Sequence, residues 1–359
     1  MKKIGVLTFH KAINNGAVLQ AYALTKAFNE VNCDARYIDY TAIKIKNDYY
    51  IKPLFKRRSI KSIGVYFLFD LNIGATHRKF KEFIERYVPV EECQLNEDVI
   101  KRKFDALVSG GDQIWNLKLT GNDTTYYLDF AKGIEKYSYG TSFGTAQFSS
   151  DETKLIRKLL SDYNQLNVRE MSAKNYIETF IGRECNVVPD PVFLLSKYEW
   201  IEQLQLLTAP IKKDYILFFE LHENEMMRSC ALRLAKENKC KIYRITNDFF
   251  KVSGMKNVKR TGPIEFLKYI LNARIVVTDS FHATAFALIF NRPLCIGLKQ
   301  GEFAQLNTRI DNLVNTFNIK SQVITDEFHY GEINYDAVNR ILNIEQEKGI
   351  AVLKEIACK

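Results

Sequence analysis

The order of apolar and polar segments along the chain constrains its fold more than any other feature. An apolar run at residues 4–9 is typical of a strand, a helical pattern follows at about 17–28, and a second strand is expected at 36–39. This β-α-β order implies a parallel sheet with right-handed crossovers. The sequence therefore predicts an α/β fold.

Two such series follow one another. The first continues with a helix near 78–87, strands at 106–108 and 137–142, a helix at 151–160 and a strand near 166–169. A polar, proline-containing stretch at 207–214 is typical of a linker. The second series comprises strands at 215–219, 241–245, 275–278 and 294–297 and helices at 225–237, 263–271 and 283–290. We therefore expect two α/β domains, 1–206 and 207–359, with a cleft between their carboxyl edges, and C-terminal helices that return to the first.

Residues 41–75 interrupt this pattern with a basic, aromatic-rich stretch. One interpretation is an insertion that covers the sheet or touches a membrane surface. The other is a solvated loop followed by a short core helix at 65–69, and we favour it because a basic face alone rarely indicates lipid binding.

Charge and cysteine content narrow the classes of partner. The 51 basic and 42 acidic residues give a net charge of +9, which favours an anionic partner. We expect no nucleic-acid binding, because no zinc spacing, RNP-like motif or helix-turn-helix pattern is present. The seven scattered cysteines, without a C-x-x-C pair, are typical of a reducing compartment. The apolar run after Lys3 ends too soon for a signal peptide, so we expect a cytoplasmic protein.

The segment Thr278-Asp279-Ser280-Phe281-His282 lies where an expected strand turns into a helix. Such a turn places backbone N–H groups at a helix N-terminus on the carboxyl edge of a sheet, where anions bind in open α/β folds. Two interpretations stay open. The segment is either a phosphate pocket with a histidine, or a helix cap with a structural histidine.

Other polar turns occupy the same topological position. Asn14-Asn15-Gly16 precedes the first helix, and Ser109-Gly110-Gly111-Asp112 follows the strand at 106–108. Their amides are suited to an anion or a sugar hydroxyl, although each glycine is also explained by a tight turn. The recurrence of such turns at strand ends favours a site.

Apart from these turns, few charged side chains or histidines are candidates for a binding site. Arg169 follows a strand and is suited to a bidentate contact with a carboxylate or phosphate, or to an ion pair with Glu170 or Asp190. Arg309 is a weaker candidate of the same kind. His10 ends the first strand, where it either donates to a ligand or lies in a loop. The remaining histidines, His77, His222 and His329, have no sequence neighbours that form a catalytic group.

Several familiar motifs are absent. The chain has no G-x-G-x-x-G after its first strand, no Walker A sequence, no G-x-S-x-G elbow, no H-E-x-x-H and no kinase motifs. These absences disfavour dinucleotide oxidoreductases, ATPases, α/β-hydrolases and zinc proteases. A transferase with an anionic donor remains.

Taken together, the motifs resemble those of the polysaccharide pyruvyl transferase family over roughly residues 4–315. The resemblance rests on residues 5–9, 14–24, 109–116, 138–144, 168–170, 188–192 and 278–282. It implies two Rossmann-like domains in a glycosyltransferase-B-like arrangement. It also implies transfer of pyruvate from phosphoenolpyruvate to two hydroxyls of one sugar in a surface-polysaccharide precursor, giving a cyclic ketal and phosphate without a metal or other cofactor.

The resemblance also implies roles for individual residues. His282 and Arg169 would be catalytic, holding and activating phosphoenolpyruvate. The domain 1–206 is expected to form the acceptor side and the domain 207–359 the phosphoenolpyruvate side. The other expected donor-site residues are Asp279, Ser280, Phe281 and Arg309. The expected acceptor or cleft residues are Asn15, Gly16, Gly110, Gly111, Asp112 and Ser142. The implied acceptor is a lipid-linked sugar or an oligosaccharide. A lipid-linked acceptor would bring the protein to the inner face of the membrane, and residues 52–61 are the first stretch to test for such contact.

One position departs from the family pattern. Many members carry an arginine two positions before the histidine, whereas this chain has Ser280. Lys299, Arg309 and Arg292 are the candidates to replace its charge. Two rival functions stay open: a glycosyltransferase that grips a nucleotide sugar through Glu220 or Glu302, and an inactive sugar- or anion-binding protein.

Overall fold

The computed structural model describes residues 1–49, 60–144, 147–209, 211, 214–247, 251–299, 301, 307–328 and 330–358. By its internal contacts the chain forms two compact units. Unit 1 comprises residues 1–51, 81–195 and 344–359, and unit 2 comprises residues 52–80 and 196–343. The sequence expectation placed one boundary after residue 206 and returned only C-terminal helices to the first domain.

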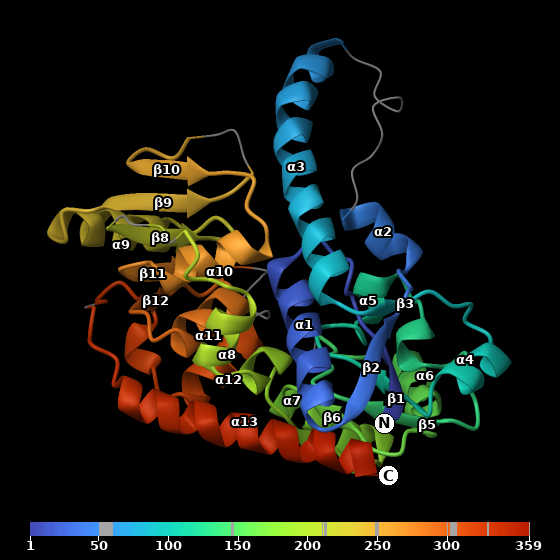
Figure 1. Cartoon of the computed structure of the whole chain (residues 1–359). Coiled ribbons are helices and arrows are strands. Elements are labelled where there is room, and N and C mark those ends of the chain that lie inside the picture. Colours follow the sequence, from blue (N-terminus) through green and yellow to red (C-terminus); the bar gives the residue numbers. More distant parts are fainter. Residues whose placement is uncertain are drawn as a thin grey trace. The chain divides into compact units, whose positions relative to one another are not determined.

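Unit 1 is a parallel α/β sheet with flanking helices (Figure 1). Its strands are β1 Lys2–Leu7, β2 Cys33–Ile38, β3 Val90–Glu91, β4 Ala106–Ser109 and β5 Glu135–Ser138, with a separate pair β6 Asn167–Val168 and β7 Asn186–Val187. Its helices are α1 Asn15–Glu30, α2 Ile43–Tyr49, α4 Glu97–Lys103, α5 Leu117–Thr120, α6 Ser150–Leu160 and α7 Met171–Tyr176.

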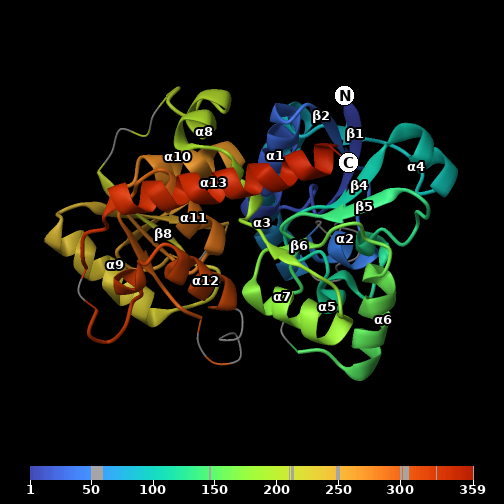
Figure 2. The same cartoon turned by 90° about the horizontal axis from the view of Figure 1, so that it is seen from below.

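Unit 2 repeats this architecture (Figure 2). Its strands are β8 Tyr215–Phe219, β9 Lys241–Ile245, β10 Met255–Val258, β11 Ile275–Thr278 and β12 Leu294–Ile296. Its helices are α8 Lys197–Gln203, α9 Glu225–Glu237, α10 Pro263–Leu271, α11 Phe281–Ile289 and α12 Thr308–Thr316. Two long helices, α3 Ile60–Tyr87 and α13 Tyr335–Cys358, each contribute residues to both units.

Both sheets have the same strand order. It is β3-β2-β1-β4-β5 in unit 1 and β10-β9-β8-β11-β12 in unit 2, with every paired strand parallel. The first strand of each unit therefore pairs with the second on one side and the fourth on the other. This reversal is a topological switch point, and ligands of open α/β sheets bind at the carboxyl ends of the two strands that flank it.

Strand β8 shows why unit 2 is covered on both faces. Successive side chains of a strand point to opposite faces. Ile216 and Phe218 belong to the core cluster that includes residues of α9. Tyr215 and Phe219 point the other way and make edge-to-face ring contacts with Tyr269 and Phe266 of α10. A strand buried on both faces must be apolar throughout, as Tyr215–Phe219 is.

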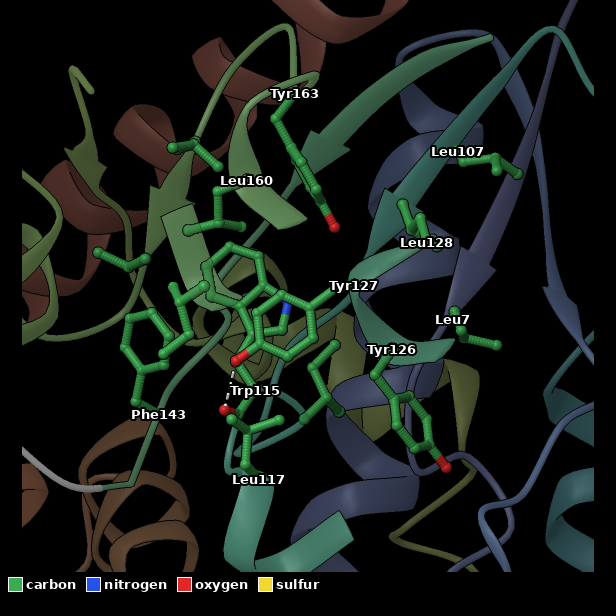
Figure 3. Packing of buried hydrophobic residues seen from close by; sticks show 14 of the residues in the cluster. Leu7, Leu107, Trp115, Leu117, Tyr126, Tyr127, Leu128, Phe143, Leu160 and Tyr163 are labelled. Atoms are coloured by element: carbon green, nitrogen blue, oxygen red, sulfur yellow. Dashed lines mark hydrogen bonds between the residues drawn. The ribbon is translucent and has the colours of Figure 1, made fainter. Parts of the chain in front are cut away.

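Aromatic residues fill the core of unit 1 (Figure 3). The rings of Trp115 and Tyr127 stack with centroids 5.4 Å apart, and the Tyr127 hydroxyl donates to the Trp115 carbonyl at 2.7 Å. Phe143 packs on the same indole. The predicted motif residues around Trp115 therefore build a rigid core beneath the carboxyl edge of the sheet.

Several sequence predictions need correction. The expected strand at 137–142 ends at Ser138, because Gly140 turns the chain at φ 64°. The expected short helix at 65–69 lies within the longer helix α3, and residues 43–49 of the expected loop form helix α2. Strand β10 was not expected. Residues 52–59 of the basic stretch lie outside the described residues. None of the helices in the described part of the chain is long and apolar enough to cross a membrane.

Candidate active site

The turn between β11 and α11 lies beside the switch point of unit 2. The Ser280 amide donates to the Thr278 hydroxyl at 3.0 Å, and that hydroxyl donates to the Phe219 carbonyl at the end of β8 at 2.7 Å. The Ser280 side chain caps α11 by accepting from the Ala283 amide at 3.4 Å. The turn is therefore anchored both to its own helix and to the neighbouring strand.

Asp279 fastens this turn to the loop after β8. Its side chain is almost fully buried, and its two oxygens accept from the backbone amides of Leu221 at 2.6 Å and His222 at 3.1 Å. A carboxylate repels an anionic donor, and both oxygens of this one bind the protein's own amides. These contacts indicate that Asp279 positions the switch-point loops.

His282 lies in the first turn of α11, whose residues are all buried. Its ring meets the Phe281 ring edge to face, with centroids 5.1 Å apart. A helix N-terminus favours negative charge through its backbone N–H groups and its dipole. The turn therefore places a buried histidine at a helix N-terminus, which is suited to an anion.

Lys299 brings positive charge to this turn. Gly297, two residues before Lys299, packs closely against Met227 of α9, because a Cβ atom at position 297 would lie only 2.0 Å from the Met227 sulfur. The Lys299 amide donates to the Asn307 side chain and the Lys299 carbonyl accepts from it, both at 2.9 Å. Burial lowers the pKa of Lys299, as does the positive charge of Arg309, while Asp279 opposes the shift.

Of the three candidates to replace the missing arginine, Arg292 is excluded. It precedes β12 and interacts electrostatically with Tyr215, the first residue of β8, so it lies at the amino edge of the sheet. Lys299 follows β12 and lies at the carboxyl edge, and Arg309 is close enough to act on its charge. Of the three candidates, Lys299 and Arg309 are therefore the two placed to act on a ligand at the turn.

His222 was missed by the sequence interpretation. Its ring Nδ1 lies 3.5 Å from Asp279 Oδ2, across the switch point. The residues are far apart in the sequence, and only the pairing of β8 with β11 brings them together. The nearby Glu220, a candidate nucleotide contact of the rival function, pairs with Arg228 at 3.0 Å and Arg244 at 3.1 Å.

In unit 1, three predicted segments meet at the carboxyl edge. The Ser142 amide donates to the Asp112 carbonyl at 2.9 Å, and the Arg169 amide donates to the Thr141 carbonyl at 3.1 Å. Thr141 also forms bridges to both Asp112 and Val168. The structure therefore brings Asp112, Ser142 and Arg169 together, as their positions at strand ends predicted.

Close packing explains why glycine occupies two positions at this edge. A Cβ on Gly111 would lie 2.4 Å from the Gln20 side-chain oxygen and 3.0 Å from Pro191, and one on Gly110 would lie 3.0 Å from Val6. Gly16 lies within α1, which Asn14 caps, so it does not form the tight turn considered from the sequence. Asn15 is the first residue of that helix.

Arg169 is a buried ion-pair hub. Its guanidinium donates to Glu170 at 2.9 Å and to Asp190 at 2.5 Å, and all three side chains are nearly inaccessible. Burial lowers the pKa of Arg169, but the carboxylates of Glu170, Asp190 and Asp112 outweigh that effect and raise the pKa above its ordinary value. The ion pair foreseen as an exposed alternative is therefore present and buried. A role in holding the donor stays a prediction.

His10 follows β1 at the same edge and is fully buried. Its Nδ1 lies 3.2 Å from the Thr8 carbonyl, its ring stacks on Tyr37 at 5.3 Å, and its Nε2 lies 4.0 Å from Asp39. Burial lowers the pKa of His10 to about 4, so the ring is neutral at pH 7. Nδ1 then carries the proton that it donates to the carbonyl.

Among the described residues, no group of three or more His, Cys, Asp or Glu side chains is placed to hold a metal ion. His77 lies within α3, and His329 and Glu302 lie outside the described residues.

Comparison with solved structures identifies the fold. UDP-GlcNAc 2-epimerase from Methanocaldococcus jannaschii is 13% identical with a TM-score of 0.51, and the match covers 100% of both chains. The enzyme from Neisseria meningitidis bound to UDP-GlcNAc is 12% identical with a TM-score of 0.50, covering 100% of this chain and 98% of that one. At such identity the likeness shows the fold alone, the two Rossmann-like units of a glycosyltransferase-B-like fold.

Sequence comparison identifies the family. No curated protein matches the chain. The model of the polysaccharide pyruvyl transferases, a family of enzymes, matches residues 14–296 of the 359. With most of its length matched, the chain belongs to the polysaccharide pyruvyl transferase family.

Proposed function

We propose that this protein transfers the pyruvate unit of phosphoenolpyruvate to two hydroxyls of one sugar, forming a cyclic ketal and inorganic phosphate. Family membership supports the pyruvyl transfer. The observation that carries the choice of donor is the buried Lys299, whose charge interacts with that of Arg309 and with Asp279 in the turn before His282. Phosphoenolpyruvate carries a phosphate and a carboxylate, and both are stabilised by cations and helix amides.

The chemistry requires proton transfer as well as charge. A proton must reach the methylene carbon of phosphoenolpyruvate while a sugar hydroxyl oxygen bonds to the adjacent carbon. Phosphate then leaves with its bonding electrons, and the second hydroxyl closes the ketal. We assign His282 to proton transfer, because histidine changes charge near neutral pH. Lys299 and Arg309 stabilise the departing phosphate.

Unit 1 is suited to the acceptor. Asp112, Glu170 and Asp190 surround the single guanidinium of Arg169 at its carboxyl edge. Glu170 and Asp190 are buried against Arg169, whereas Asp112 is only partly buried, and such a carboxylate repels an anionic donor but accepts hydrogen bonds from sugar hydroxyls. We therefore assign the acceptor to unit 1, with Asn15, Gly16, Gly110, Gly111 and Ser142 on the same edge, and we assign Arg169 first to holding the carboxylates.

One assay tests the function. Purified protein is supplied with phosphoenolpyruvate and a panel of lipid-linked and nucleotide-linked hexoses, and phosphate release is measured together with ketal formation by mass spectrometry. Phosphate and ketal in equal amounts are expected. Binding of UDP or GDP without phosphate release would instead favour a nucleotide-sugar glycosyltransferase, and ligand binding without any turnover an inactive homologue.

A lipid-linked acceptor would place the enzyme at the membrane surface, through the basic residues at 52–61. Cosedimentation with vesicles that contain anionic lipid tests this contact. Reversal of the charges at Lys56, Arg57 and Arg58 is expected to reduce binding, because each basic residue near such a surface contributes about 1 kcal/mol. Unchanged cosedimentation would show that these basic residues do not bind the membrane.

A further inference from the structure

His222 and Asp279 form a second histidine-containing group at the switch point of unit 2. Asp279 belongs to the turn after β11 and His222 to the loop after β8, so the pair joins the two strand ends where the sheet order reverses. Asp279 Oδ2 accepts from the His222 amide at 3.1 Å and lies 3.5 Å from the ring Nδ1. One carboxylate therefore holds the backbone of His222 and lies beside its ring.

The two members of the pair differ in exposure. The Asp279 side chain is 1% exposed, whereas the His222 side chain is 31% exposed. The Leu221 amide fixes the other Asp279 oxygen at 2.6 Å, so the carboxylate cannot turn away. A buried carboxylate that orients a more accessible imidazole is the arrangement that activates a histidine for proton transfer. The 3.5 Å separation is longer than a good hydrogen bond, and such contacts shorten when substrate binds.

The proposed reaction requires two proton-transfer groups. Addition of a sugar hydroxyl across the enol double bond places a proton on the methylene carbon and removes one from the hydroxyl in the same step. One histidine cannot be the protonated donor and the neutral acceptor at once. His282 fills only one of these roles, and it follows Asp279 by three residues.

We propose that His222, oriented by Asp279, is the second proton-transfer residue of the pyruvyl transfer. This inference rests on the proposed function. His282 gives its proton to the methylene carbon as the first sugar oxygen bonds to the neighbouring carbon, and His222 takes the proton of that hydroxyl. The carbon–oxygen bond to phosphate then breaks, and His222 returns its proton to the leaving phosphate. The second hydroxyl forms the other ketal bond and gives its proton to His282, so both histidines regain their starting states.

The roles within the pair follow from its geometry. Nδ1 faces Asp279, so we assign Nε2 as the atom that exchanges protons with substrate. Asp279 is a positioning residue that acts through His222. The charge of Lys299, after β12, acts on Asp279. Near His222 in the sequence, Glu220 and Glu223 instead contact Arg228 of α9, at 3.0 Å and 3.7 Å.

Kinetics of His222→Ala and Asp279→Asn test the proposal, with Glu223→Gln as the control. Glu223 lies next to His222 in the sequence, and its side chain is 90% exposed. We expect kcat of His222→Ala to fall about 100-fold with little change in the KM for phosphoenolpyruvate, and one limb of its pH–rate profile to disappear. Added imidazole should restore part of the activity. Asp279→Asn should show a smaller fall in kcat, and Glu223→Gln none.

The outcomes separate this inference from the proposed function. If wild-type protein releases no phosphate from phosphoenolpyruvate with any hexose, the proposed function fails. If wild-type protein is active and His222→Ala keeps its kcat and both limbs of the profile, the function stands and His222 is not a proton-transfer residue. A lowered kcat that imidazole does not restore, with the pH–rate profile unchanged, would assign His222 a structural role only.

Discussion

The two sheets share one strand order, yet different charged side chains follow the strands at their switch points. In unit 1, one buried guanidinium interacts with three carboxylates, and the histidine at the edge is neutral. In unit 2, Lys299 and Arg309 interact with each other, and Asp279 is the carboxylate that offsets the charge of Lys299. The same topology thus carries a carboxylate-rich cluster around one arginine in unit 1 and an interacting lysine and arginine in unit 2. The side chains that follow the strands, and not the fold, determine the ligand.

The largest expected effect tests the chemistry of unit 2. His282→Ala should lower kcat by about 10²- to 10⁴-fold, because it removes a group that transfers a proton in the rate-determining chemistry. Phosphate release with excess phosphoenolpyruvate measures it. Urea unfolding of the variant verifies that it is folded. Turnover equal to wild type would show that His282 does not transfer the proton.

A second experiment tests whether Arg169 maintains the acidic edge of unit 1. Arg169→Met leaves the carboxylates of Glu170 and Asp190 buried without their cation, so the free energy of unfolding should fall by about 3–5 kcal/mol. Urea denaturation measures the loss. Arg274→Met is the matched control, because its pair with Asp214 is about half exposed and should contribute less than ~1 kcal/mol. Equal losses in the two variants would contradict the buried hub.

The neutral state of His10 predicts a pH effect on stability. Its pKa in the folded protein is about 4, below the ordinary value of 6.5. The unfolded chain therefore binds a proton first as the pH falls, and stability that is present above pH 6.5 is lost toward pH 4. This loss is about 3 kcal/mol for the shift. Urea unfolding of wild type and His10→Asn at several pH values measures it, and identical pH dependence would contradict the prediction.

The smallest effect concerns the charge of unit 2. Lys299→Met should raise the KM for phosphoenolpyruvate about tenfold to a hundredfold, since a hydrogen bond to a charged group contributes about 1.5–3 kcal/mol. Arg292→Met, at the amino edge of the same sheet, is the control and should leave the KM unchanged. Equal effects of the two substitutions would show that only the net charge of the unit matters.

Local pattern predicted much of this fold. Strands β8, β9 and β11 and helices α9 and α10 have the predicted bounds. Strands β8 and β11 are short continuous apolar runs, and helices α9 and α10 repeat their apolar residues over the full element. Strand β10 was missed since its sequence, Met-Lys-Asn-Val, is half polar at the edge of the sheet. The predicted strand beyond Ser138 failed at Gly140, whose left-handed conformation no apolar pattern reveals.

For the candidate sites too, local sequence revealed some residues and could not reveal others. Turns that follow strands were found from local sequence, and the structure brings Asp112, Ser142 and Arg169 together as expected. The contact of His222 with Asp279 and the interaction of Lys299 with Arg309 depend on which strands are neighbours, which one sequence does not specify. The cleft between the domains and the roles of the predicted residues stay predictions.

The two long helices that contribute to both units have a consequence for synthesis of the protein. Residues 52–80 are translated before most of unit 1 but belong to unit 2, and residues 344–359 are translated after all of unit 2 but belong to unit 1. Unit 1 therefore cannot acquire all its contacts until residues 344–359 have been translated, although N-terminal domains usually fold first. No single cut in the chain separates the units, so expression of either half is expected to yield an incomplete core.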